Sequence, residues 1–186
     1  MVLWLRSGYI YIGGVFMELF AKPGVGGIIE KNIDGVDCIL MQDRCKDDAK
    51  SEYGLLEIPA GKIREFENIF DCLRREIWEE TGLRVTEIKG EAEAIAIESN
   101  GYKVLNYTPF SCSQNIQGTY PIMVQTFICN ADGELLDKSN ETKNIRWLSL
   151  KELNKLLEHD KNVFYPMHVT TLQKYCKLKL GQVTIK

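Results

Sequence analysis

Short apolar runs mark most of the chain as strand, and one longer run repeats with the helical period. Residues 25–31 and 36–42 are apolar runs that flank an Asp-Gly pair at 34–35, which is the signal of a hairpin turn. Residues 67–81 repeat their apolar positions at helical spacing and are followed by Gly82, a typical helix C-cap. The pattern therefore predicts a hairpin followed by a central helix.

The remaining pattern completes a mixed architecture. Two more helices are predicted near the C-terminus, over residues 150–159 behind a Ser149 cap and over residues 167–178. Residues 111–120 are expected to form a polar loop. The other strand-like runs are residues 55–58, 84–89, 92–98, 102–107, 122–129 and 145–148. Strands on both sides of one helix, with helices at the end of the chain, favour an α/β (α+β) fold in which a mixed sheet packs between helices.

The length of the chain fits one domain. A chain of 186 residues is large enough to bury a real core, so we predict a single domain over residues 1–186. Its first 20 residues are mostly apolar, but Arg6 and Glu18 interrupt them and no small-residue cleavage site is clear. We therefore expect residues 1–24 to be an N-terminal extension that packs on the domain, rather than a signal peptide.

The predicted central helix carries acids on its apolar side. With Ile69 as the reference, Ile77 falls at about 80° around the helix axis. Glu80 falls at about 20°, Glu76 at about 340° and Glu79 at about 280°, along and beside the same stripe. Burying a carboxylate without a partner costs several kcal/mol, and the first two acids also repel each other across one turn. Either this helix edge is solvated, or a bound cation makes the acids favourable.

The spacing of residues around this helix is specific. Residues 61–83, GKIREFENIFDCLRREIWEETGL, follow the pattern G-x5-E-x7-R-E-U-x-E-E-x-G-U, where U is aliphatic. This resembles the signature of the Nudix hydrolase family, and every fixed position is present. The resemblance implies a Nudix-type α-β-α sandwich with a mixed central sheet. It also implies a pyrophosphohydrolase that cleaves the diphosphate bond of a nucleoside diphosphate linked to another moiety.

The acids also indicate the metal. Carboxylates at i, i+3 and i+4 converge on one point, and oxygen ligands suit Mg²⁺ or Mn²⁺ rather than zinc. The family resemblance implies Glu76, Glu79 and Glu80 as ligands, together with the carbonyl of Ala60. It implies a supporting role for Glu67, either for the loop or for a water bound to the metal.

Proton transfer is the second task of such a site. The resemblance implies that a metal-bound water attacks one phosphorus and that a glutamate takes its proton. Glu79 and Glu141 are the two candidate bases, with Glu134 as the fallback for the later loop. Arg75 lies one turn before Glu79 and can hold it by an i,i+4 ion pair.

The substrate is less specified than the reaction. Residues 57–61, EIPAG, resemble the E-L-P-A-G run of ADP-ribose and other nucleotide-sugar pyrophosphatases. Gly61, Tyr102, Pro109 and Tyr120 are the candidate substrate contacts, and residues 107–120 are rich in the aromatic and amide groups that hold a base and a ribose. Two alternatives stay open: a pool-cleaning nucleoside triphosphate pyrophosphohydrolase, and a non-hydrolytic Nudix-fold nucleotide sensor.

Charge and cysteine usage exclude other classes. The net charge of −3 gives no electrostatic reason to expect nucleic acid or an anionic membrane, so we expect a small-molecule nucleotide as the partner. No apolar run is long enough to span a bilayer. The six cysteines form no C-x-x-C pair, which favours free thiols and a cytoplasmic location. A homodimer is left open.

Overall fold

The computed structural model describes residues 3–5, 9–12, 15–45, 50–118, 120–139 and 141–181. Its centre is an eight-stranded mixed sheet whose main path runs β11-β12-β4-β5-β13. β4 and β12 pair in parallel, and the other pairs of this sheet are antiparallel. Its strands are β4 (Lys22–Ile33), β5 (Val36–Arg44), β6 (Leu56–Glu57), β7 (Ala60–Lys62), β8 (Arg84–Ile88), β11 (Ser111–Gln114), β12 (Ile122–Asp132) and β13 (Thr142–Ser149).

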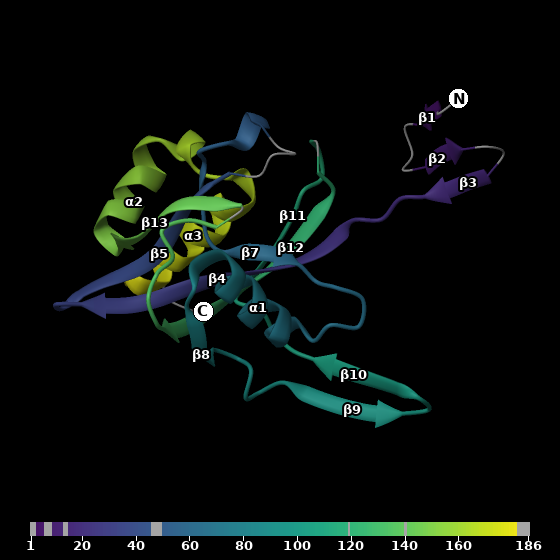
Figure 1. Ribbon diagram of the computed structural model, residues 1–186, viewed down its shortest axis with the longest axis horizontal. Helices are drawn as coiled ribbons and strands as arrows, with labels where there is room; N and C mark the ends of the chain where they lie inside the picture. The colour runs from purple at the N-terminus through teal and green to yellow at the C-terminus, as the bar shows by residue number, and fades with distance from the viewer. Residues whose placement is uncertain are drawn as a thin grey trace.

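Helices cover both faces of this sheet (Figure 1). Helix α1 (Ile69–Thr81) packs on one face, while α2 (Leu150–His159) and α3 (Pro166–Lys179) pack on the other. The sheet has a hydrophobic core on each face. Alternate residues of a strand contribute to the two cores, because successive side chains point to opposite faces. On β4, for example, Ile29 joins the core under α1 and Ile28 joins the core under α2 and α3. The predicted sandwich with a mixed sheet is confirmed.

The ends of α1 are set by local chemistry. The Asn68 side chain accepts a hydrogen bond from the Phe70 N–H at 2.9 Å, so the helix begins at Ile69, two residues later than predicted. Gly82 ends it in the left-handed conformation, at φ 77°. Inside the helix, Ile77 packs so closely on β4 that a Cβ added at Gly27 would lie 2.8 Å from its Cδ1 atom. The acids of α1 are therefore held at a fixed depth over the sheet.

One segment differs from the predicted pattern, and two predicted strands form a sheet of their own. Residues 111–114 were expected in a polar loop but form β11, because their backbone pairs with β12 although their side chains are polar. Strands β9 (Ile95–Ser99) and β10 (Tyr102–Asn106) form a separate two-stranded sheet with its turn at 100–101. The remaining short elements are the 3₁₀ turns η1 (Lys50–Glu52) and η2 (Lys161–Val163).

The N-terminal strands form a sheet of their own. Strands β1 (Leu3–Leu5), β2 (Tyr9–Ile12) and β3 (Val15–Glu18) pair antiparallel in a three-stranded sheet that lies to one side of the central sheet in Figure 1. Since β4 begins at Lys22, the last three residues of the predicted extension belong to the central sheet. That the extension packs on the domain stays a prediction. Among the described residues, no helix is both long and apolar enough to cross a membrane.

Glu30 ties α3 to the sheet. From β4 one of its oxygens accepts a hydrogen bond from the Tyr175 hydroxyl at 2.7 Å and also lies 2.6 Å from the Lys179 ammonium. Its other oxygen accepts from the Lys89 ammonium at 2.6 Å. Burial raises the pKa of this carboxyl, but the hydrogen bonds from the two lysines and the tyrosine outweigh burial and lower it overall. The ionised form is therefore favoured in the folded protein.

We expect Glu30→Gln to destabilise the protein by about 1 kcal/mol at pH 7, because it removes the charge that two ammonium groups contact. A carboxyl whose folded pKa is lowered contributes stability above its unfolded pKa, and that contribution is lost as the pH falls through the folded pKa. The difference in unfolding free energy between the two proteins should thus shrink from pH 6 towards pH 3. Urea titrations at several pH values measure it, and a difference independent of pH would contradict the prediction.

Candidate active site

Arg75 is the centre of the acidic cluster on α1. Its guanidinium donates to both oxygens of Glu67, at 2.7 and 2.9 Å, and to one oxygen each of Glu76 and Glu79, the latter at 3.1 Å. The predicted ion pair with Glu79 is confirmed. The bidentate contact with Glu67 is shorter than the contact with Glu79. Hydrogen bonding to Arg75 lowers the pKa of Glu67 to about 2, and these carboxylates raise the pKa of Arg75.

The loop before α1 is closed by the same acid. The Arg64 N–H donates to Glu67 at 2.9 Å, which fixes the turn between β7 and the helix. Cys72 lies behind this loop, with its thiol donating to the Lys62 carbonyl at 3.4 Å. Burial and the neighbouring Glu67 raise the pKa of Cys72 to about 12, so the thiol stays protonated at neutral pH. The contact of this thiol with the Lys62 carbonyl supports the loop.

Glu80 is the buried member of the cluster, with 3% of its surface exposed. One of its oxygens accepts from the Gln42 side-chain amide at 2.7 Å and from the Ala60 N–H at 3.1 Å. Strands β5 and β7 thus meet helix α1 at this carboxylate. Sequence reasoning missed Gln42; the available signal was a polar residue at the end of the apolar run 38–41, where the strand continues into the core.

Gly61 is required by the position of Glu76. A Cβ added at Gly61 would lie 1.9 Å from the Glu76 carboxyl carbon and 2.0 Å from one of its oxygens. The carboxylate therefore lies directly against the backbone of β7, and any side chain at position 61 would displace it. This gives a steric reason for the glycine, which the sequence analysis had placed among the substrate contacts.

The acidic cluster is also a candidate cation site. Among the described residues, no group of three or more His, Cys, Asp or Glu side chains is arranged to hold a metal ion, and Arg75 lies between Glu67, Glu76 and Glu79. The chemistry nevertheless fits a hard divalent cation: carboxylate oxygens one helical turn apart, Glu76 and Glu80, both lie against the β7 backbone at 60–61. The assignment of these residues as ligands stays a prediction.

Of the two candidate bases, Glu79 lies in the last turn of α1 and Glu141 lies in a loop whose next residue contacts that turn. Glu79 is 49% exposed and lines a cavity of about 570 Å³ whose other lining residues are Trp78, Gly82, Arg84, Gly133, Glu134 and Leu136. Glu141 is exposed in the loop before β13; its carbonyl accepts from the Cys45 N–H at 2.7 Å. The next residue, Thr142, donates to the Glu80 carbonyl at 3.2 Å. The loop of Glu141 therefore reaches the end of α1, while its role as a base stays a prediction.

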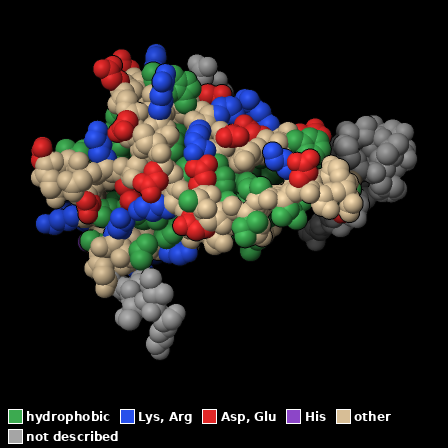
Figure 2. Space-filling model, turned by 90° about the horizontal axis from the view of Figure 1, so that it is seen from below, with side chains coloured by type: hydrophobic (Ala, Val, Ile, Leu, Met, Phe, Trp, Pro, Cys, Tyr) green, Lys and Arg blue, Asp and Glu red, His purple; other side chains and the backbone are tan. Residues whose placement is uncertain are grey.

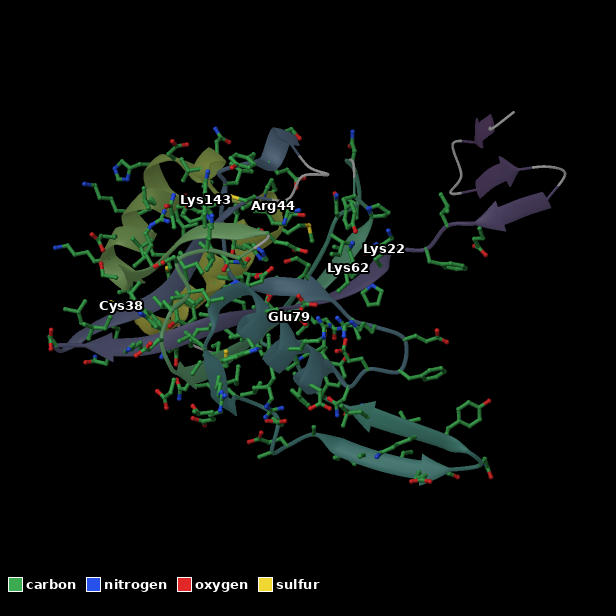
Figure 3. All side chains as sticks on the ribbon, in the orientation of Figure 1. Lys22, Cys38, Arg44, Lys62, Glu79 and Lys143 are labelled. Atoms are coloured by element: carbon green, nitrogen blue, oxygen red, sulfur yellow. The ribbon has the colours of Figure 1, made fainter. Side chains whose placement is uncertain are left out.

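The predicted substrate contacts come from different elements of the fold, and their role stays a prediction. Tyr102 is 73% exposed in the separate β9-β10 sheet, and Pro109 is half-buried between β10 and β11. Tyr107 packs edge-on against Phe70 in the core under α1 and so offers no open ring face to a base on that side. Tyr120 lies close to β7: the Lys62 ammonium lies 5.1 Å from its ring centre (Figure 3 labels the lysine).

We expect Gln42→Leu to destabilise the protein by about 1–3 kcal/mol, because it removes the side-chain amide that donates a hydrogen bond to the buried Glu80 carboxylate. It should also weaken Mn²⁺ binding, since Glu80 loses a contact that fixes its orientation. Urea unfolding and calorimetric titration with Mn²⁺ measure the two effects. Gln125→Leu, at a half-buried glutamine of β12, is the control and should change Mn²⁺ affinity less than twofold. Equal Mn²⁺ affinity in Gln42→Leu and the wild type would show that Gln42 does not orient the site.

Comparison with known proteins identifies the family to which the chain belongs. The family model described as NUDIX domain matches residues 21–167. No curated protein sequence matches the chain.

Solved structures share the fold at low identity. The NUDIX domain of Shewanella oneidensis NrtR, in complex with ADP ribose, is 12% identical with a TM-score of 0.59, over 86% of this chain and 88% of that chain. The E. coli ORF135 protein is 21% identical with a TM-score of 0.56, over 88% and 94%. A C. elegans Ap4A hydrolase is 15% identical with a TM-score of 0.51, over 86% and 98%. Since the family model spans most of the sequence, the chain belongs to the NUDIX domain family and is a Nudix-type pyrophosphohydrolase.

Proposed function

We propose that this hydrolase cleaves the diphosphate bond of a nucleoside diphosphate linked to another moiety, with Mg²⁺ or Mn²⁺ as the cofactor. The observation that carries the proposal is the junction at Glu80. There a buried carboxylate of α1 is fixed by Gln42 and by the Ala60 N–H, beside the cluster that Arg75 holds together. Such a junction places several carboxylate oxygens against one half-buried strand, where the negative charge of a diphosphate requires a cation.

In this proposal the residues have distinct tasks. Glu76, Glu79 and Glu80, with the Ala60 carbonyl, would hold the cation, and Glu67 would contribute through a water. A divalent cation in this position neutralises phosphate charge and makes a water more acidic. Arg75 keeps the acids of α1 and the loop in register through its contacts with Glu67, Glu76 and Glu79.

The chemical step is a displacement at phosphorus. The oxygen of a water forms a bond to one phosphorus, and the bond from that phosphorus to the bridging oxygen breaks. The bridging oxygen leaves with the other phosphate, and the water proton passes to a glutamate. Glu79 and Glu141 are the candidates for this base; the half-exposed carboxylate of Glu79 beside the cavity supports the first, and the contact of the neighbouring Thr142 with α1 supports the second.

For the substrate we propose a nucleotide sugar such as ADP-ribose, split to a nucleoside monophosphate and a sugar phosphate. The support is the EIPAG run, because its Ala60 and Gly61 form the β7 backbone on which Glu80 and Glu76 lie. A NUDIX domain with the same fold holds ADP ribose in its crystal structure, so the fold accommodates such a ligand. The alternative substrate is a nucleoside triphosphate, cut to the monophosphate and pyrophosphate.

We expect Glu80→Gln to lower kcat by about a thousandfold while the protein stays folded, because the change keeps the shape of the side chain and removes its charge. Mg²⁺-dependent nucleotide release and thermal unfolding measure the two properties. Asp71→Asn is the control on the same helix, since that carboxylate is 72% exposed and points away from the cluster to Arg74. If Glu80→Gln turned over substrate like the wild type, the assignment of Glu80 as a ligand would be wrong.

The substrate is tested by comparing specificity constants. We expect kcat/KM for ADP-ribose to exceed that for any single deoxynucleoside triphosphate by at least about tenfold, equivalent to about 1.4 kcal/mol of transition-state binding. A panel of both substrate classes with Mg²⁺ and with Mn²⁺ measures this ratio. If one triphosphate were preferred over ADP-ribose by the same margin, the proposed substrate would be wrong and the hydrolase assignment would remain.

A further inference from the structure

Two lysines converge on one tyrosine ring next to the acidic cluster. The Lys22 ammonium lies 5.2 Å, and the Lys62 ammonium 5.1 Å, from the ring centre of Tyr120. We call these three residues the lysine–tyrosine cluster; Figure 3 shows Lys22 and Lys62 near each other at the start of β4. Neither lysine forms an ion pair with a carboxylate of the described residues. Two positive groups without such a partner lie beside the most acidic part of the chain.

The sheet register explains why the lysines share a side. Gly24 of β4 pairs with Lys62 of β7, and Lys22 lies two residues before Gly24 on the same strand. Because side chains alternate along strands, Lys22 and Lys62 lie on one face, and Gly61, against which Glu76 lies, faces the other. The lysines and the acids are therefore separated by the thickness of a single short strand.

Backbone contacts connect the two groups. The Lys62 carbonyl accepts from the Arg75 guanidinium at 3.3 Å, so the strand that carries one lysine is held by the centre of the acidic cluster. On the other side, the Lys22 N–H donates to the Pro121 carbonyl at 2.8 Å, and the Asn115 amide donates to the Tyr120 carbonyl at 2.7 Å. The lysine–tyrosine cluster is thus fixed to the site by the backbone.

The charges are unbalanced unless an anion is present. A cation on an aromatic ring at an exposed site contributes only about 0.5–1 kcal/mol, and a second ammonium near the same ring is repelled by the first. The Tyr120 hydroxyl is buried and has no hydrogen-bond partner among the described residues. The two ammonium groups contact the ring of Tyr120. A phosphate oxygen between the ammonium groups would turn repulsion into two charge-assisted contacts.

We infer that Lys22 and Lys62, spaced by Tyr120, bind a phosphate group of the substrate across β7 from the acids. This inference rests on the proposed function and deepens it: the acids with their cation hold the phosphate that is attacked, and the lysines hold the other phosphate of the same diphosphate. After cleavage that group is the phosphomonoester of one product, so a product carries the same recognition element. Tyr120 is a positioning residue that sets the spacing of the lysines.

The test separates phosphate recognition from turnover by using matched ligand pairs. AMP is compared with adenosine, and ribose 5-phosphate with ribose, in calorimetric titrations of the full chain without a divalent cation. For at least one pair, the wild type should bind the phosphorylated member at least about tenfold more tightly, and Lys22→Gln should reduce that ratio by about tenfold. In turnover, Lys22→Gln should raise KM by about tenfold and lower kcat no more than about twofold.

The chain offers a matched control on the same strand. Lys31 of β4 lies 5.2 Å from the ring centre of Trp147, at the opposite end of the sheet from the acids, so Lys31→Gln removes an equivalent lysine–aromatic contact. It should leave the phosphate ratio and KM unchanged within twofold. Tyr120→Leu removes the ring that spaces the lysines and should raise KM while lowering kcat no more than about twofold, as Lys22→Gln does.

The outcomes separate this inference from the proposed function. A lysine-dependent phosphate ratio in a protein that hydrolyses no nucleotide would support the anion site and refute the proposed substrate class. Turnover of ADP-ribose with the same KM and the same phosphate ratio in Lys22→Gln and the wild type would overturn the anion site and leave the hydrolase in place. Equal effects of Lys22→Gln and Lys31→Gln would also overturn it, because loss of any lysine on a ring would then suffice.

Discussion

The contact of one guanidinium with three carboxylates is the interaction on which the site depends. Arg75 holds Glu67, Glu76 and Glu79, which come from the loop before α1 and from two positions of the helix itself. Without a positive charge between them these acids would repel one another in a partly buried place, where charge interactions are stronger than in water. The same contact orders the loop, because Glu67 also accepts from the Arg64 N–H.

A second constraint is the close approach of backbone and side chain around β7. Gly61 has no side chain, and the Glu76 carboxylate occupies that space, while the Ala60 N–H donates to Glu80. The acids of α1 therefore lie against one side of this short strand, and the strand's own Lys62 places a positive group on the other side. Figure 2 shows acidic and basic side chains interspersed on the face it presents, rather than one large surface of a single sign.

Much of the fold followed from local patterns. The hairpin at 34–35, the end of α1 at Gly82 and the Ser149 cap of α2 were all predicted, because each depends on residues within one turn of the chain. Strand β11 was missed because its polar side chains give no apolar signal; its strand character comes from pairing with β12. The start of α1 was predicted two residues early because the cap geometry of Asn68 decides it.

The sequence by itself determined the family, the helix with its acids and the i,i+4 contact between Arg75 and Glu79, since fixed spacing on a helix fixes which side chains are neighbours. Only the tertiary structure decided which distant groups meet them. Gln42 reaches Glu80 across 38 residues, and Lys22 meets Tyr120 where β4 and β12 pair. Such contacts depend on sheet register and on the depth at which α1 packs over Gly27, and no local spacing in the chain encodes either quantity.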